Sequence, residues 1–130
     1  AGQVLFRLDA RPFQAALRQA QAALARDAAQ ADNARRDAER YRALVAKDYV
    51  TKSQADQADA SASALMATLQ ADSAAVESAR LSLAYTVIRS PIDGRTGSLL
   101  VRRGNLVKAN ADPLVVINQI HPILIRFPVS

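Results

Sequence analysis

Apolar residues recur with a seven-residue period along the middle of the chain, in two successive runs. In the first run these positions are Phe13, Leu17, Ala20, Leu24, Ala31, Ala34, Ala38, Tyr41 and Val45. In the second run they are Ala55, Ala58, Ala62, Leu65, Leu69, Val76, Ala79 and Leu83. This period is that of a heptad seam, in which one stripe of each helix packs on a partner helix. The pattern therefore predicts two helices that share a seam.

The two runs are separated by a short polar break at Lys47–Val50. Thr51 and Gln54 follow it with the spacing of a capping box, which starts a helix. A connection this short forces the two helices to lie antiparallel. We expect a hairpin over residues 9–86 with its tip at about 46–52. A first helix of residues 11–46 would be about 54 Å long.

The positions of the seam also predict how the two helices are aligned. Pairing the two runs about the break places Tyr41 opposite Ala55 and Leu17 opposite Ala79, so that large residues meet small ones at almost every layer. An alignment shifted by one heptad also matches, but it would move the reversal into the second helix. We therefore favour the first alignment. It puts Asp27 and Asp72 in adjacent layers of the seam, where we expect them to be partly hydrated, because burial of an unpaired carboxylate is costly.

Composition supports an elongated helical segment. Residues 9–86 contain 25 alanines, and alanine has the highest helix propensity. The four glycines lie outside this segment. Its ten basic and ten acidic residues cancel, so the net charge of +5 comes from the flanks. Without a basic helix face that carries aromatic residues, we predict no binding to nucleic acid.

Candidate catalytic and metal-binding chemistry is sparse in the sequence. There is no cysteine, and His121 is the single histidine, which we interpret as a loop residue. A paired nucleophile and base, a cluster of metal ligands and a phosphate-binding glycine loop are all absent from the sequence. The sequence therefore predicts a protein that is not an enzyme and has no metal or cofactor.

Short strands are predicted on both sides of the hairpin. Val4–Leu8 precedes it, and the segments that follow it are Tyr85–Arg89, Ser98–Val101, Leu106–Lys108 and Leu114–Ile117. Turn residues such as Pro91 and Gly94 separate them. The predicted fold class is α+β, with the hairpin inserted into one small β module.

These segments resemble the periplasmic adaptor, or membrane fusion, proteins of RND (resistance-nodulation-division) efflux pumps, which are related to HlyD, AcrA and MexA. The resemblance rests on stretches that follow one another in the family's order on either side of the hairpin. They are residues 2–9, 11–17, 83–95, 104–107 and 112–117.

The resemblance implies a lipoyl-like β module formed from two half-motifs. Residues 1–8 would end the first half-motif, residues 87–117 would form the second, and residues 118–130 would begin a β-barrel domain. It also implies a location in the periplasm of a Gram-negative bacterium, associated with the inner membrane. The implied partners are an inner-membrane RND transporter, a TolC-like outer-membrane channel and further copies of the full-length protein, expected as a hexamer.

The resemblance assigns a contact with the outer-membrane channel to three residues at the hairpin tip. In many of these adaptors an arginine, a leucine and a serine occupy the spacing that Arg40, Leu44 and Thr51 have here. Threonine replaces the serine, which keeps the hydroxyl group and adds a methyl group. Thr51 could serve only as a helix cap, and Leu44 could only widen the seam beside Val45.

Three other functions compete with a drug-efflux adaptor. An adaptor of an ABC-type exporter or of a type I secretion system would use the same hairpin and half-motifs. A lipoyl or biotinyl carrier domain would need a lysine on a tight hairpin between the two half-motifs, a place that the coiled coil takes here, and a lipoyl or biotinyl group on Lys47 or Lys52 would support it. A generic coiled-coil scaffold would not need the turn-rich segment after Tyr85.

Overall fold

The computed structural model describes residues 1–108 and 111–122. In chain order the elements are β1 (Val4–Arg7), α1 (Arg11–Val45), α2 (Lys52–Ala84), β2 (Val87–Arg89), β3 (Arg95–Leu99) and β4 (Val115–Asn118). They form two compact units, one of residues 7–87 and one of residues 1–6 with the described part of 88–130. The predicted α+β class with a long helical hairpin is confirmed. Among the described residues no helix has the length and apolar content needed to cross a membrane.

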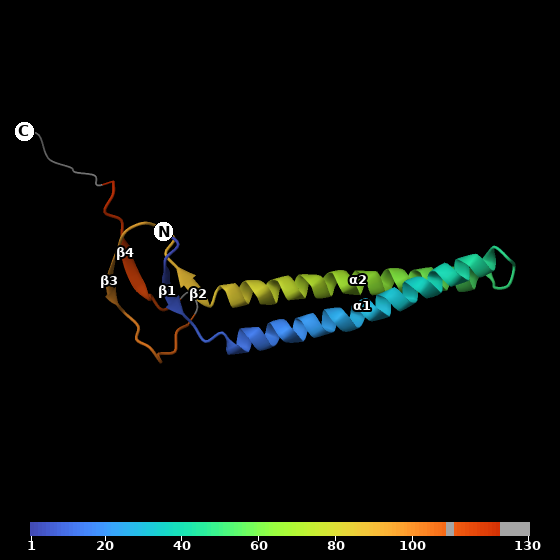
Figure 1. Ribbon diagram of the computed structural model, residues 1–130, viewed down its shortest axis with the longest axis horizontal. Coiled ribbons are helices and arrows are strands. Elements are labelled where there is room, and N and C mark those ends of the chain that lie inside the picture. The colour runs from blue at the N-terminus through green and yellow to red at the C-terminus, as the bar shows by residue number, and fades with distance from the viewer. Residues whose placement is uncertain (109–110, 123–130) are drawn as a thin grey trace, which may run out of the picture. The chain divides into compact units, whose positions relative to one another are not determined.

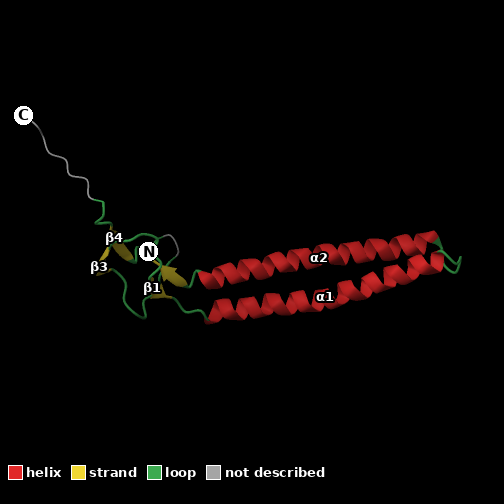
Figure 2. Ribbon diagram, turned by 45° about the horizontal axis from the view of Figure 1, so that its top comes forward, coloured by secondary structure: helices red, strands yellow, loops and turns green. Residues whose placement is uncertain are grey.

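Helices α1 and α2 lie side by side along their length and are joined by one loop (Figures 1 and 2). α1 begins at Arg11, with Pro12 in its first turn, where a missing N–H is tolerated. The Arg11 N–H donates to Asp9 Oδ1 at 3.0 Å, and the Arg11 guanidinium binds the same carboxylate. This hydrogen bonding lowers the pKa of Asp9 to about 2. The Asp9 side chain thus caps the helix, since Ala10 provides no capping side chain.

The seam between the helices is narrow and rich in alanine. Its buried apolar residues are Ala31, Ala38, Ala55, Ala62 and Val76. The larger seam residues predicted from the sequence are half-buried, namely Leu17, Leu24, Tyr41, Leu65, Leu69 and Leu83. Phe13 is 38% exposed. Two helices cover only the inner side of a large side chain, so the flanks of these residues stay open to solvent.

The β strands form two separate pairs. β1 pairs with β2, where the Gly2 N–H donates to the Ser90 carbonyl at 2.8 Å and the Ser90 N–H donates to the Gln3 carbonyl at 2.9 Å. β3 pairs antiparallel with β4, with Arg95 opposite Asn118.

Two of the strand predictions are wrong: one strand lies at a different position, and the other does not form. The strand predicted at Ser98–Val101 is β3, which runs from Arg95 to Leu99. The strand predicted at Leu106–Lys108 does not form, and Leu106 is 91% exposed. Alternation of apolar residues over so few positions cannot establish a pairing partner. Part of the segment predicted to begin a β-barrel, residues 123–130, lies outside the described residues.

Gly94 allows the close approach of the turn before β3 to the end of β4. A Cβ atom at Gly94 would lie 2.5 Å from the Asn118 carbonyl oxygen, whereas one at Gly97 would lie 3.7 Å from that of Val116. We expect Gly94→Ala to destabilise the β3–β4 pair by about 1–3 kcal/mol, because the backbone must move apart. Gly97→Ala is the matched control and should be tolerated. Equal loss of amide protection in β4 for both variants, measured by hydrogen exchange, would contradict this prediction.

Candidate docking site at the hairpin tip

The loop at the tip reverses the chain in a compact turn. The Asp48 N–H donates to the Val45 carbonyl at 3.0 Å, and the Tyr49 N–H donates to the Leu44 carbonyl at 3.1 Å. This pair of bonds is the Schellman pattern that ends many helices. Asp48 has φ of 57°, in the left-handed region that glycine usually occupies. The reversal thus occurs at the predicted break.

Thr51 caps α2 through the predicted capping box. The Gln54 N–H donates to Thr51 Oγ1 at 3.3 Å, and the Thr51 N–H donates to Gln54 Oε1 at 3.0 Å. The two residues therefore satisfy two amide groups at the start of the helix. This contact gives the Thr51 hydroxyl a structural role whether or not it also touches a partner.

We expect Thr51→Ala to destabilise the hairpin by about 1 kcal/mol, and Thr51→Ser to have little effect. The reason is that serine keeps the capping oxygen and alanine removes it. Urea denaturation of each variant, followed by circular dichroism, measures the difference. Equal stability of all three proteins would mean that the cap is not needed in solution.

The two other predicted tip residues lie on α1, one helical turn apart. The Arg40 side chain is 68% exposed, and its guanidinium lies 3.0 Å from Asp37 on the same helix. Leu44 is half-buried. Leu44 therefore presents less apolar surface than a fully exposed anchor would, although part of its side chain remains accessible. Because residues four apart share a helix face, Arg40 and Leu44 can contact one partner together.

Tyr49 is a candidate docking residue that the sequence did not single out. Its side chain belongs to the tip loop and is 75% exposed. Its neighbour Val50 is half-buried. The one feature of the sequence that could have identified it is a tyrosine within a polar break between two helices. Hydrophobic periodicity does not predict the direction of a loop side chain.

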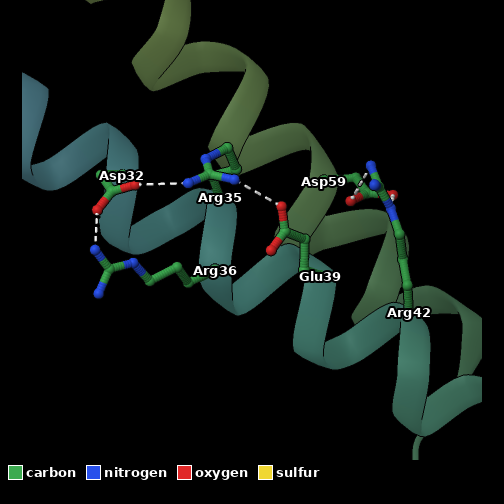
Figure 3. A network of polar contacts seen from close by, with 6 residues as sticks. All are labelled: Asp32, Arg35, Arg36, Glu39, Arg42 and Asp59. Atoms are coloured by element: carbon green, nitrogen blue, oxygen red, sulfur yellow. Dashed lines mark hydrogen bonds and ion pairs between the residues drawn. The ribbon is translucent and has the colours of Figure 1, made fainter.

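Several ion pairs lie on the stretch of the hairpin next to the tip (Figure 3). On α1, Arg35 bridges Asp32 and Glu39, and Arg36 also contacts Asp32. The hydrogen bond from Arg35 lowers the pKa of Asp32.

One of these pairs joins the two helices. Arg42 Nε on α1 lies 3.0 Å from Asp59 Oδ2 on α2, and Arg42 Nη2 lies 2.9 Å from Asp59 Oδ1. One charge-assisted hydrogen bond and a second close approach of opposite charges favour one relative alignment of the helices. It thus helps to keep the tip in one conformation.

A carboxyl pair lies in the seam farther from the tip. Asp27 is 6% exposed, and its carboxylate accepts hydrogen bonds from Arg26 at 2.6 and 2.9 Å. The hydrogen bond from Arg26 lowers the pKa of Asp27. Interaction with the Asp27 carboxyl group raises the pKa of Asp72 across the seam, where Asp72 Oδ2 is buried without a hydrogen-bond partner among the described residues. The structure therefore buries Asp27 more than we expected, and the adjacent arginine compensates its charge.

The hairpin also has a groove of about 780 Å³ between its helices. Several of its lining residues carry an amide or hydroxyl group, including Gln30, Asn33, Gln54, Gln57 and Ser61. The groove is widely open to solvent, whereas small-molecule sites are enclosed enough to bury most of their ligand. Within the described residues, no group of three or more histidine, cysteine, aspartate and glutamate side chains is arranged to hold a metal ion. The exposed tip therefore remains the candidate functional site.

A known family matches the hairpin. The family model described as RND MFP (membrane fusion protein), alpha-helical hairpin domain, matches residues 16–86, more than half of the chain. The chain belongs to this family. The family predicted from the sequence is thus confirmed. Membrane fusion proteins of RND pumps are adaptors and not enzymes, in agreement with the prediction of a non-enzymatic chain.

Relatives of this membrane fusion protein family are similar over the whole chain. The multidrug resistance protein MdtA of Pantoea ananatis is 45% identical over all of this chain, which spans 32% of that protein. MdtA of Erwinia amylovora is 43% identical over 98% of the chain, which again spans 32% of the relative. The chain therefore spans about a third of the length of these curated relatives.

A solved structure is similar to both the hairpin and its flanks. It is a MacA–MexA chimeric protein that contains the Pseudomonas aeruginosa MexA α-hairpin domain. The similarity has a TM-score of 0.50 and 35% sequence identity, and covers 89% of this chain and 36% of the chimera.

Proposed function

We propose that the full-length protein is the periplasmic adaptor of an RND multidrug efflux pump. It joins a proton-driven inner-membrane transporter to a TolC-like outer-membrane channel, and the hairpin tip docks on the channel. The observation that carries the proposal is the match of residues 16–86 to the RND hairpin family. Relatives named as multidrug resistance proteins support drug efflux as the process. Because the matched family is the RND group, we favour an RND transporter over an ABC-type exporter.

The remaining parts of the proposal concern the β strands and the assembly. The strand pairs β1–β2 and β3–β4 would belong to two half-motifs of a lipoyl-like module, with residues 118–130 leading into a β-barrel. Several full-length copies, expected as a hexamer, would line a sealed passage between the two membranes. The location would be the periplasm of a Gram-negative bacterium, on the inner membrane. A carrier domain would instead require a lipoyl or biotinyl group on Lys47 or Lys52, which intact-mass spectrometry can detect.

Purification of the full-length protein from its native membranes tests this function directly. We expect an RND transporter and an outer-membrane channel to co-purify with it after mild cross-linking. Deletion of its gene should make the cells sensitive to drugs. Recovery of an ABC-type exporter in place of the RND transporter would overturn the proposal.

A further inference from the structure

We propose that Tyr49 is an additional docking residue, an aromatic anchor that the turn at Asp48 holds out for the outer-membrane channel. This inference rests on the proposed function and adds a residue to the same contact. Within residues 46–51 Tyr49 is the one large hydrophobic side chain that is exposed, with 75% of its surface accessible. Leu44, in contrast, is half-buried. Tyr49 thus offers the larger apolar contact at the tip.

The backbone of the turn fixes the direction in which Tyr49 leaves the tip. Its N–H donates to the Leu44 carbonyl at 3.1 Å, and that same carbonyl accepts from the Lys47 N–H at 3.1 Å. The left-handed conformation of Asp48, with φ of 57°, is what allows the Tyr49 N–H to reach back to the helix. Asp48 is therefore a positioning residue for Tyr49. A residue held in this way loses little conformational entropy when it binds.

The chemistry of tyrosine suits a docking contact at the end of a rod. Its ring supplies a large contact area with only two rotatable side-chain bonds, and tyrosine is enriched among residues that dominate binding energy. The Tyr49 N–H is also hydrogen-bonded to the Leu44 carbonyl, so the two residues belong to one continuous surface at the tip.

The charges beside Tyr49 indicate the chemistry of the partner's site. Exposed Lys47 and Lys52 flank the loop, together with exposed Asp48. The structure therefore fits an apolar crevice that offers a hydrogen-bond acceptor to the phenol and a rim of carbonyl or carboxylate oxygens. We assign this crevice to the periplasmic end of the outer-membrane channel.

Binding of the full-length protein to the purified outer-membrane channel of its pump tests the assignment. Tyr49→Ala should raise Kd about tenfold or more, and Tyr49→Phe should stay within about threefold, because the ring carries most of the contact. The matched control is Tyr85→Ala, which removes another exposed tyrosine, 68% accessible, at the far end of α2. It should leave Kd unchanged.

Variants of Asp48 separate positioning from folding. Asp48→Gly keeps the turn, since glycine adopts the left-handed region freely, and should bind as tightly as the wild type. Asp48→Val disfavours that region and should weaken binding about tenfold although Tyr49 remains, with helix content unchanged by circular dichroism. Tight binding by both Tyr49→Ala and Asp48→Val, beside loss of binding by Leu44→Asp, would overturn this inference alone. Absence of wild-type binding to the channel would instead overturn the docking function.

Discussion

Replacing Leu44 with aspartate in the full-length protein should abolish drug resistance while leaving expression and binding to the inner-membrane transporter intact. Leu44 is half-buried at the end of α1 and is part of the surface around the tip. A carboxylate in a desolvated contact must either give up its hydration or keep the partner away. Either result removes the contact with the channel. The minimum inhibitory concentration of a pump substrate in a deletion strain that carries the variant measures the effect.

A second substitution shows whether Leu44→Asp acts by unfolding the hairpin. Arg40→Asp reverses a charge on the same face, at a side chain that is 68% exposed, so its cost to folding should be small. Resistance should be lost again, because the docking surface loses the hydrogen-bond donors of the guanidinium and gains a negative charge that repels the partner. Arg18→Asp is the matched control, since Arg18 is exposed near the other end of α1. Full resistance with Leu44→Asp, or loss that follows helix content in the three variants, would contradict docking through this tip.

The sequence predicted the hairpin well because few features determine it. Helix α1 was expected over residues 11–46 and runs from Arg11 to Val45. Alanine-rich heptads without an internal glycine or proline admit few alternatives to a pair of long helices. The capping box could also be predicted from the sequence, because it depends only on the spacing of Thr51 and Gln54 at the start of a helix. These features are local, and local patterns are visible in a sequence.

The features that the sequence did not predict depend on the folded chain. Exposure of Tyr49 follows from the left-handed conformation of Asp48, which a sequence without glycine in the turn gave no reason to expect. The ion pair of Arg42 with Asp59 forms across two helices and has no signature in the sequence. Leu106 failed to form a strand because pairing requires a partner at the right distance, which alternation of apolar residues cannot supply.

The carboxyl pair in the seam should make the stability of the hairpin depend on pH. Interaction with the Asp27 carboxyl group and burial raise the pKa of Asp72 above its ordinary value of 3.8. Folded protein therefore holds this proton more tightly than the unfolded chain does. The stabilisation is fully present below 3.8 and is lost as the pH rises through the raised pKa. Asp27 behaves in the opposite way, because Arg26 lowers its pKa and its contribution is lost as the pH falls.

Together the two shifts mean that the pair stabilises the folded hairpin most at a pH near the ordinary pKa of aspartate. At that pH the two carboxyl groups share one proton. Above the raised pKa of Asp72, two carboxylates face each other across the seam with Arg26 as their nearby cation. We expect Asp72→Asn to remove the loss of stability that the wild type shows as the pH rises above 3.8, because an amide can donate to Asp27 without a titratable proton. At neutral pH this variant should unfold at a higher temperature than the wild type.

Thermal unfolding of wild type and variant across this pH range measures the effect as a difference, in which the titration of other carboxyl groups cancels. Asp56→Asn is the matched control, because Asp56 is an exposed aspartate on the same helix. Its profile should run parallel to that of the wild type. If the Asp72→Asn profile also runs parallel to that of the wild type, then the two carboxyl groups do not share a proton. In that event ionisation of Asp72 would not destabilise the hairpin, because Arg26 would compensate the charge of both carboxylates.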